Sequence, residues 1–321
     1  MTSQKSSSQD SSVQNKASVA YIGPCVLVIL VMLVALLMSQ QDLNGKSDLS
    51  MAAENSLAEL EGFNKQAWLL PDEDLLGFVK IPAGTFIMGS NPSVDRMAFE
   101  NERWSTARRQ GTLSLPEYYI GRYEVTVAQY RVFLADTVYK HDAQTLSNPD
   151  THPVNYVSWT DALAYGRWLE LKLVDSVNTP DALQQLLAEG AHITLPSEAQ
   201  WEKAARGSRG KIYPWGSQPS EEFANYRSAS TKPVGSFECP DCENGLADMS
   251  GNVWELTRSP YQAYPYSIED DRDNLQADAL WVMRGGSYSD EPANIRAAIR
   301  GGVDPGVRNA TIGFRLVLSV Q

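Results

Sequence analysis

Apolar residues in this chain form one long unbroken run, followed by a mosaic of short periodic stretches. The run covers residues 19–38, and no charged residue occurs between Lys16 and Asp42. A helix rises about 1.5 Å per residue, so about 20 residues cross a hydrocarbon layer roughly 30 Å thick. The run therefore predicts a transmembrane helix.

The segments on either side of this run predict its orientation. Residues 1–18 are rich in Ser and Gln with no apolar period, which predicts a disordered tail. Lys5 and Lys16 favour a cytoplasmic tail, with the rest of the chain in a bacterial periplasm, anchored once in the inner membrane. The alternative is a cleaved signal peptide, whose apolar region would be about 7–15 residues long and would end at small residues.

Residues 39–74 are interpreted as a linker or stalk before a globular domain at 75–321. A short helical pattern at 56–70 makes Leu57, Leu60 and Trp68 candidates to lie against the domain or the membrane surface.

Helix-start signals mark the first half of the domain. Thr126 and Ser158 each precede a periodic apolar stretch, so they are predicted to begin helices that reach about residues 136 and 169. A further helix is predicted to follow Pro196 and Ser197 and to end at Gly207. A fourth helix is predicted between Thr179 and Gly190.

Strand patterns are shorter and separated by loops. Residues 78–90 predict two strands joined by a turn, 118–124 predicts another strand, and the polar stretch 91–113 predicts a surface excursion. After Gly207, Gly, Pro and Asn dominate, and the predicted short strands lie near 233–237, 253–256, 281–285, 296–299 and 313–318. This mixture predicts an α+β fold with few long elements, held together by loop packing.

Composition narrows the class of ligand. The 27 basic and 39 acidic residues give a net charge of −12, and no basic stripe stands out. Nucleic-acid binding depends on clustered Lys and Arg, so a nucleic-acid partner is not expected. The 43% apolar content is ample for a core.

The stretch 244–258, NGLADMSGNVWELTR, combines glycines with Asn and Asp, which tolerate left-handed backbone. It predicts a shaped loop that leads into a strand carrying Glu255. Such a carboxylate could join main-chain carbonyls around a hard cation, or it could cap backbone amides in a structural turn.

Eight phrases in order along about 240 residues resemble the formylglycine-generating enzyme family, also called sulfatase-modifying-factor domains. Besides GLADMSGNVWEL they are GTFIMG at 84–89, YEVTVAQY at 123–130, HPVNYVSWTDALAYGRWL at 152–169, LPSEAQWEKAARG at 195–207, YPWG at 213–216, RGGSY at 284–288 and IGFRLV at 312–317. The resemblance implies this family's fold, a much-elaborated relative of C-type-lectin-like domains.

In enzymes of this family, two cysteines after GGSY bind copper and oxidise a substrate cysteine. Here the matching positions carry Asp290 and Ile295, and no cysteine follows Cys242. Cu(I) requires soft thiolate ligands, so copper and formylglycine-generating activity are not expected. Trp254 and Ser287 match positions that line the family's substrate groove, and Asp290 and Arg296 complete the candidate groove. Arg296, Arg300 and Arg315 could bind a ligand carboxylate, but internal ion pairs are favoured.

The resemblance also implies structural calcium. One family site uses the positions of Asp248, Gly251, Val253 and Glu255, which are all present. A second site would begin at Asn225 and Tyr226, but the acidic stretch that completes it is missing.

Cys239 and Cys242 form CPDC, which could be a redox pair, half of a zinc site or a local disulfide. Zinc would need two more ligands that nothing nearby supplies, and thioredoxin-like exchange is disfavoured because no helix is predicted after the pair. A structural disulfide is the favoured interpretation. His141, His152 and His192 share no metal-ligand spacing, so structural or solvated roles are favoured.

Three hypotheses follow. The first is a membrane-anchored, non-catalytic domain that binds a periplasmic peptide or protein partner. The second is an oxidoreductase or maturation enzyme of the family with altered active-site chemistry; three scattered histidines exclude the version with an added helical iron domain. The third, a variable ligand-binding surface at 288–312, ranks lower because that segment lacks Asn enrichment.

Overall fold

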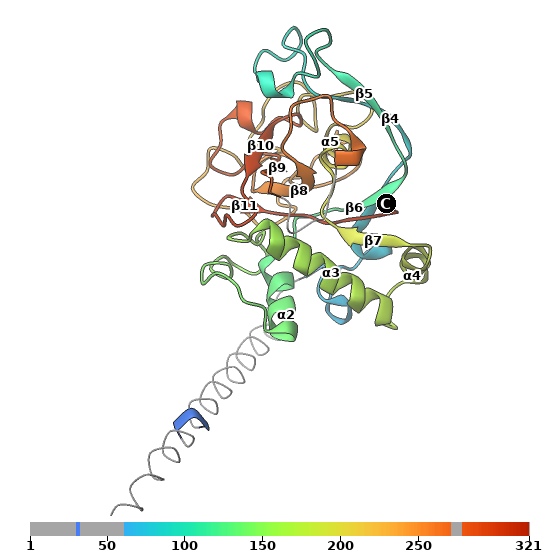
Figure 1. The fold of residues 1–321 in the computed structure, drawn as a ribbon, viewed down its shortest axis with the longest axis vertical. Helices are drawn as coiled ribbons and strands as arrows, with labels where there is room; N and C mark the ends of the chain where they lie inside the picture. Colours follow the sequence, from blue (N-terminus) through green and yellow to red (C-terminus); the bar gives the residue numbers. More distant parts are fainter. Residues whose placement is uncertain (1–29, 33–60, 271–277, 321) are drawn as a thin grey trace, which may run out of the picture. The chain divides into compact units, whose positions relative to one another are not determined.

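The computed structural model describes residues 30–32, 61–270 and 278–320 (Figure 1). The chain divides into two units, 1–48 and 49–321. In the first unit the described residues Leu30, Val31 and Met32 are helical with exposed side chains. The rest of the predicted 19–38 span, the 1–18 tail, and Leu57 and Leu60 lie outside the described residues. Within the described ranges, no helix combines the length and apolar character needed to cross a bilayer.

The domain begins earlier than its predicted start at residue 75. Strands β1 (Phe63–Asn64) and β2 (Leu70–Pro71) pair antiparallel around the 3-10 turn η1 (Lys65–Ala67). A second turn, η2 (Asp74–Gly77), follows. Leu69 is buried, and Trp68 meets Trp168 edge to face, so Trp68 does lie against the domain. The helical pattern predicted at 56–70 is wrong for the described residues from 61 onward.

The central sheet has the strand order β3-β6-β12-β7. Its members are β3 (Phe78–Ile81), β6 (Tyr118–Gly121), β7 (Ala191–Thr194) and β12 (Val317–Val320), all antiparallel to their neighbours. Because side chains alternate along a strand, β12 serves two cores. Leu318 joins the core that contains helices α2 and α3, whereas Val317 joins the core beside helix α5.

Four helices form where the sequence predicts them. They are α2 (Val127–Thr137), α3 (Trp159–Asp175), α4 (Asp181–Ala188) and α5 (Glu198–Arg206). Thr126, Ser158 and Ser197 each form a reciprocal capping box, in which the cap side chain and the residue three positions on bond each other's backbone. In Figure 1, α2 and α3 lie on one side of the β6/β7 strands, and α5 lies on the other.

A second four-stranded sheet carries the region with the strongest family resemblance. Its order is β10-β9-β8-β11, from β8 (Trp254–Pro260), β9 (Trp281–Arg284), β10 (Arg300–Val303) and β11 (Ile312–Gly313). The β8–β11 pair is parallel and places Ile312 opposite Trp254. A separate ribbon pairs β4 (Gly84–Met88) with β5 (Gly111–Leu115). Short 3-10 turns occur at η3 (Glu100–Glu102), η4 (Ile268–Asp270) and η5 (Pro292–Asn294).

The α+β class is confirmed, with several local corrections. Residues 233–237 and 296–299 form turns and not the predicted strands, since Gly235 adopts positive φ and the nearby strand begins at Arg300. The polar excursion at 91–113 is only partly on the surface. Asp95 and Glu102 are buried there, because they pair with a buried arginine described below.

Candidate functional site

The loop before β8 has the shaped backbone that its sequence predicts. Gly245, Asp248, Gly251 and Asn252 all have positive φ. A side chain at Gly251 would place its Cβ 2.2 Å from the main-chain oxygen of Asn225, so only glycine fits there. The loop therefore approaches its neighbour closely and delivers Trp254 to the start of β8.

Asn252 connects this loop to the rest of the domain. Its side-chain oxygen accepts from the Lys232 amide at 3.0 Å and from Asn225 at 3.1 Å, and its nitrogen donates to Glu124 at 2.6 Å. Glu124 also accepts from the amide of Val253. Sequence reasoning missed Glu124, although a carboxylate among apolar residues in YEVTVAQY was a usable signal.

Three of the four candidate groove residues do meet. Asp290 Oδ2 accepts from the Trp254 indole at 2.9 Å, from the Ser287 amide at 2.9 Å and from the Ser287 hydroxyl at 2.6 Å. Its other oxygen accepts from Asn294 at 3.1 Å. Ser289 is exposed beside them, and its hydroxyl is 3.3 Å from that of Ser287. We call Trp254, Ser287, Ser289 and Asp290 the Asp290 platform.

The turn after β9 explains how Ser287 reaches this position. Gly285 and Gly286 both have positive φ, and a Cβ on Gly286 would lie 2.2 Å from the main-chain oxygen of Asn294. The two glycines therefore allow the chain to fold back tightly, so that residues 287 and 290 face each other.

The two positions that match the family's copper cysteines have different surroundings. Asp290 belongs to the hydrogen-bonded platform. Ile295 is fully buried in an apolar cluster with Tyr213, Ala224 and Tyr226. Carboxylate oxygen and hydrocarbon are both unsuited to Cu(I), so these residues do not fit the copper centre of the family.

Arg296 is the candidate groove residue that the structure places elsewhere. Its buried guanidinium bonds Asp95 at 2.7 Å and Glu102 at 2.5 and 2.8 Å. Its assignment to the groove is therefore wrong. Ion pairs also hold the other two arginines: Arg300 with Glu198 and Arg315 with Glu255. The internal ion pairs favoured from the sequence are confirmed for all three.

The carboxylate predicted to bind calcium is paired with an arginine in this arrangement. Both oxygens of Glu255 accept from Arg315 at 2.6 Å, and one also accepts from the Trp201 indole at 2.7 Å. Glu255 is fully buried, so the guanidinium takes the place that a cation would need. One oxygen of Asp248 accepts from the Gly235 amide at 2.7 Å.

Buried carboxylates gather around this ion pair. Burial raises the pKa of Asp248 to about 6 and raises the pKa of Glu124 well above its ordinary range. The negative charges of Asp248 and Glu255 raise the Glu124 pKa further. One arginine therefore faces three buried carboxylates.

The second predicted calcium position also has a different role. The side chain of Asn225 donates to the main-chain oxygen of Ser230 and to Asn252, and Tyr226 packs in the apolar cluster of Ile295. Over the described ranges, no cluster of three or more His, Cys, Asp or Glu side chains could hold a metal ion.

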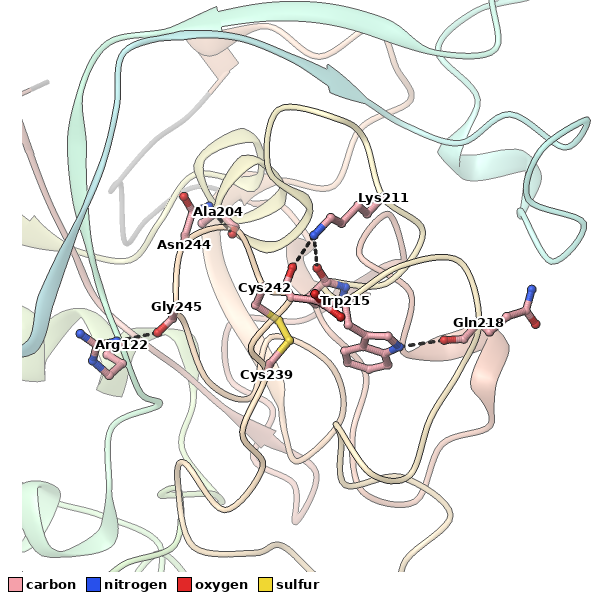
Figure 2. The surroundings of a disulfide bond; sticks show 11 residues. Arg122, Ala204, Lys211, Trp215, Gln218, Cys239, Cys242, Asn244 and Gly245 are labelled. Atoms are coloured by element: carbon pink, nitrogen blue, oxygen red, sulfur yellow. Dashed lines mark hydrogen bonds between the residues drawn. A yellow bond between two sulfur atoms is a disulfide. The ribbon is translucent and has the colours of Figure 1, made fainter.

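The predicted disulfide between Cys239 and Cys242 is confirmed (Figure 2). It lies in a turn closed by a bond from the Cys242 amide to the Cys239 oxygen, and no α-helix occurs after it in the described residues. The bond lies before the loop that leads to Trp254.

The three histidines lie apart, with separate partners. His141 contacts the main-chain oxygen of Tyr139, His152 contacts the Thr231 hydroxyl, and His192 contacts Glu170. These contacts agree with the structural or solvated roles favoured from the sequence.

Comparison with known proteins places this geometry in a family. Residues 69–320 match the family of Sulfatase-modifying factor enzyme 1-like domains, and the chain belongs to this family. It is 27% identical over 290 residues to a hercynine oxygenase of Mycolicibacterium smegmatis, an alignment that covers 75% of this chain and 61% of that protein. The chain thus spans less than two thirds of that relative's length.

A second relative is an inactive C-alpha-formylglycine-generating enzyme 2 of Bos taurus, 33% identical over 182 residues, which cover 51% of this chain and 49% of that one. Among solved structures, PvdO from Pseudomonas aeruginosa superimposes with a TM-score of 0.60 at 23% identity and covers 75% of this chain and 94% of that chain. This last likeness supports the fold alone.

Proposed function

We propose that this chain is a membrane-anchored, non-catalytic member of its family that presents the Asp290 platform to a peptide or protein partner in the bacterial periplasm. The observation that carries the proposal is the bonding of Asp290. At the position of a copper ligand, its carboxylate accepts four hydrogen bonds from Trp254, Ser287 and Asn294. Hydrogen bonds to a carboxylate thus hold these residues in place, and none of them offers a sulfur ligand.

The platform has the chemistry of a peptide-binding surface. Trp254 is half-buried and offers an aromatic face, while Ser289 is exposed and supplies a hydroxyl that can both donate and accept. Next to it, Arg227 and Glu291 form an exposed ion pair. Aromatic anchors surrounded by adaptable polar groups suit an extended peptide, whose backbone carries donors and acceptors in alternation.

A turnover assay separates this proposal from the alternative of an altered enzyme. The purified full-length chain is loaded with Cu(I) and incubated with a cysteine peptide, and aldehyde formation is followed by mass spectrometry. We expect no aldehyde. Turnover, or a stoichiometric redox metal in the purified protein, would instead support the oxidoreductase or maturation enzyme.

Binding at the platform is tested by site-specific photo-crosslinking in the cells that make the protein. A photoreactive amino acid replaces Ser289 on the platform or, as a control, Ala182, which is exposed on α4. We expect a discrete crosslinked partner from position 289 alone. The same products from both positions would contradict the proposal.

The anchor at 19–38 is tested separately by carbonate extraction of membranes and by protease protection. We expect the full chain to stay with the membrane fraction and the domain to be digested only after the outer membrane is opened. A chain released by carbonate would contradict the anchor and leave the platform proposal standing.

A further inference from the structure

The Cys239–Cys242 disulfide is poorly suited to stabilising the fold. Its cysteines are three positions apart in the sequence. A crosslink that closes so short a ring removes little freedom from the unfolded chain, and the ring reaches no distant element. The accessibility and neighbours of the bond indicate a chemical role.

A pocket of about 330 Å³ lies beside the disulfide. Its size is in the range of small-ligand sites. Trp254, Ser287 and Asp290 are not among its described lining residues, so it is distinct from the Asp290 platform. The lining includes Cys239, Glu238 and Arg122.

The chain after the disulfide is anchored to the body of the domain. Figure 2 shows Asn244 donating to the main-chain oxygen of Ala204 on α5, and Arg122 donating to that of Gly245. In addition, Glu243 accepts from the Ser208 amide. If the sulfur–sulfur bond opens, Cys242 therefore stays in place.

The chain before the disulfide is also bonded to the body of the domain, but further from its cysteine. The Gly235 amide donates to Asp248 at 2.7 Å and the Val234 amide donates to the main-chain oxygen of Thr151 at 2.9 Å. Among the described hydrogen bonds, residues 236–238 have only the local bond from Ser236 to Pro233. Cys239 lines the pocket and is half-buried, so an incoming group can reach its sulfur from the pocket side. Cys242 is half-buried as well but is not among the described lining residues, so the two cysteines differ in which of them lines the pocket.

Lys211 places a positive charge next to Asp241, the residue before Cys242. Its ammonium donates to the main-chain oxygens of Asp241 and Pro214, which bridges the disulfide loop to the YPWG loop (Figure 2). A nearby ammonium stabilises a thiolate, and exchange is faster when the leaving sulfur has a lower pKa.

We propose that this pocket reversibly captures thiol compounds as a mixed disulfide on Cys239. The thiol loses its proton to water, and the resulting thiolate attacks Sγ of Cys239. A new sulfur–sulfur bond forms, the Cys239–Cys242 bond breaks, and its electron pair leaves on Cys242 as a thiolate beside Lys211. The reverse attack of Cys242 on Cys239 releases the thiol and restores the disulfide, so no external oxidant is consumed.

The first test traps the adduct with reduced glutathione as the probe. The full-length protein in mild detergent is mixed with glutathione, quenched in acid at successive times and alkylated, and its peptides are mapped by mass spectrometry. We expect glutathione on Cys239 and alkylated Cys242. Glutathione on Cys242, or opening of the disulfide without a mixed disulfide at any time point, would overturn the proposal.

The second test addresses Lys211 through the rate of opening. Lys211→Gln should slow opening roughly threefold, because the leaving thiolate loses its neighbouring charge, and Lys211→Arg should restore the rate. Lys140→Gln, an equal charge change at an exposed loop position, is the matched control. A wild-type rate in Lys211→Gln overturns the assigned leaving group even if that variant's melting temperature falls.

The third test asks whether thiols enter through the pocket. Glu238 is exposed and lines it, so Glu238→Lys should speed opening by anionic glutathione and slow opening by cationic cysteamine. Glu189→Lys at the end of α4 is the control with the same charge change. Equal effects of both variants on both thiols would show that entry does not use the pocket. None of these tests depends on the Asp290 platform, so their failure leaves the proposed function untouched.

Discussion

The indole nitrogen of Trp254 donates to a carboxylate oxygen of Asp290 across 2.9 Å, although the residues are 36 positions apart. The bond joins the start of β8 to the turn that follows β9, and the same oxygen accepts from Ser287. Asp290 thus connects Trp254 and Ser287 at a position that matches a copper ligand in the enzymes of the family. The stability of the platform should therefore depend on Asp290 as a hydrogen-bond acceptor more than on its negative charge.

Asp290→Ala should therefore destabilise the domain. The change leaves the Trp254 indole and the Ser287 amide without their acceptor, at a cost of about 1–3 kcal/mol. Asp290→Asn keeps one side-chain oxygen and should lose less. The free energy of unfolding is measured by urea titration followed through tryptophan fluorescence.

Glu291→Ala provides the control for this series. Glu291 is exposed and pairs with Arg227 on the surface, so its loss should cost less than about 1 kcal/mol. Equal losses for the alanine variants at 290 and 291 would show that the hydrogen bonds to Asp290 do not organise the platform.

Restoring the two cysteines should not restore a copper centre. In the double variant Asp290→Cys with Ile295→Cys, one sulfur would replace the platform carboxylate and the other would enter the buried cluster of Tyr213 and Tyr226. Because Ile295 packs in that cluster and not with the Asp290 platform, we expect the two thiolates not to meet on one Cu(I). Competition with a chromophoric Cu(I) chelator should give the same affinity for the double variant and for Asp290→Cys alone. Much tighter binding by the double variant would show that the two positions converge.

Arg296 should matter for stability. Replacing it by Met leaves Asp95 and Glu102 buried without their cation, which typically costs about 3–5 kcal/mol. Arg227→Met, which breaks an exposed pair, should cost less than about 1 kcal/mol. Chemical unfolding and partner crosslinking from position 289 are measured on the same samples. A folded Arg296→Met variant that loses only the crosslink would instead indicate a binding role.

Local signals in the sequence were sufficient for the helices but not for the site. The capping boxes of Thr126, Ser158 and Ser197 lie within four residues, so a short window contains the whole signal. The pairing of Arg296 with Glu102 spans 194 positions, and neither neighbourhood carries a sign of it. A polar stretch around Glu102 is therefore indistinguishable from a surface loop until its partner is known.

The same limit explains the assignment of Glu255. Its sequence context matched a family calcium position, but the residue that occupies its oxygens is Arg315, 60 positions further on. Trp254, Ser287 and Asp290 were predictable as a group because two family phrases contain the first two, and Asp290 follows the second phrase at a fixed distance. Their mutual hydrogen bonds were not, since these depend on how tightly the two glycines turn the chain.

Asp248 should make the domain less stable as the pH rises through weakly acidic values. Its pKa is about 6 in the folded protein, because burial disfavours the charged form, and about 3.9 in an unfolded chain. Between these values the folded state holds a proton that the unfolded state has lost, so stability falls as pH rises from about 4 to about 6. Above this window the buried charge costs up to about 3 kcal/mol.

Asp248→Asn should raise the free energy of unfolding by up to that amount at pH 7.5 and leave it unchanged at pH 4, whereas the exposed control Asp72→Asn should change neither. Unfolding is measured in EGTA and again with added calcium. Because Arg315 holds Glu255, the two profiles should coincide, and a calcium-dependent gain that Asp248→Asn abolishes would restore this loop as a calcium site.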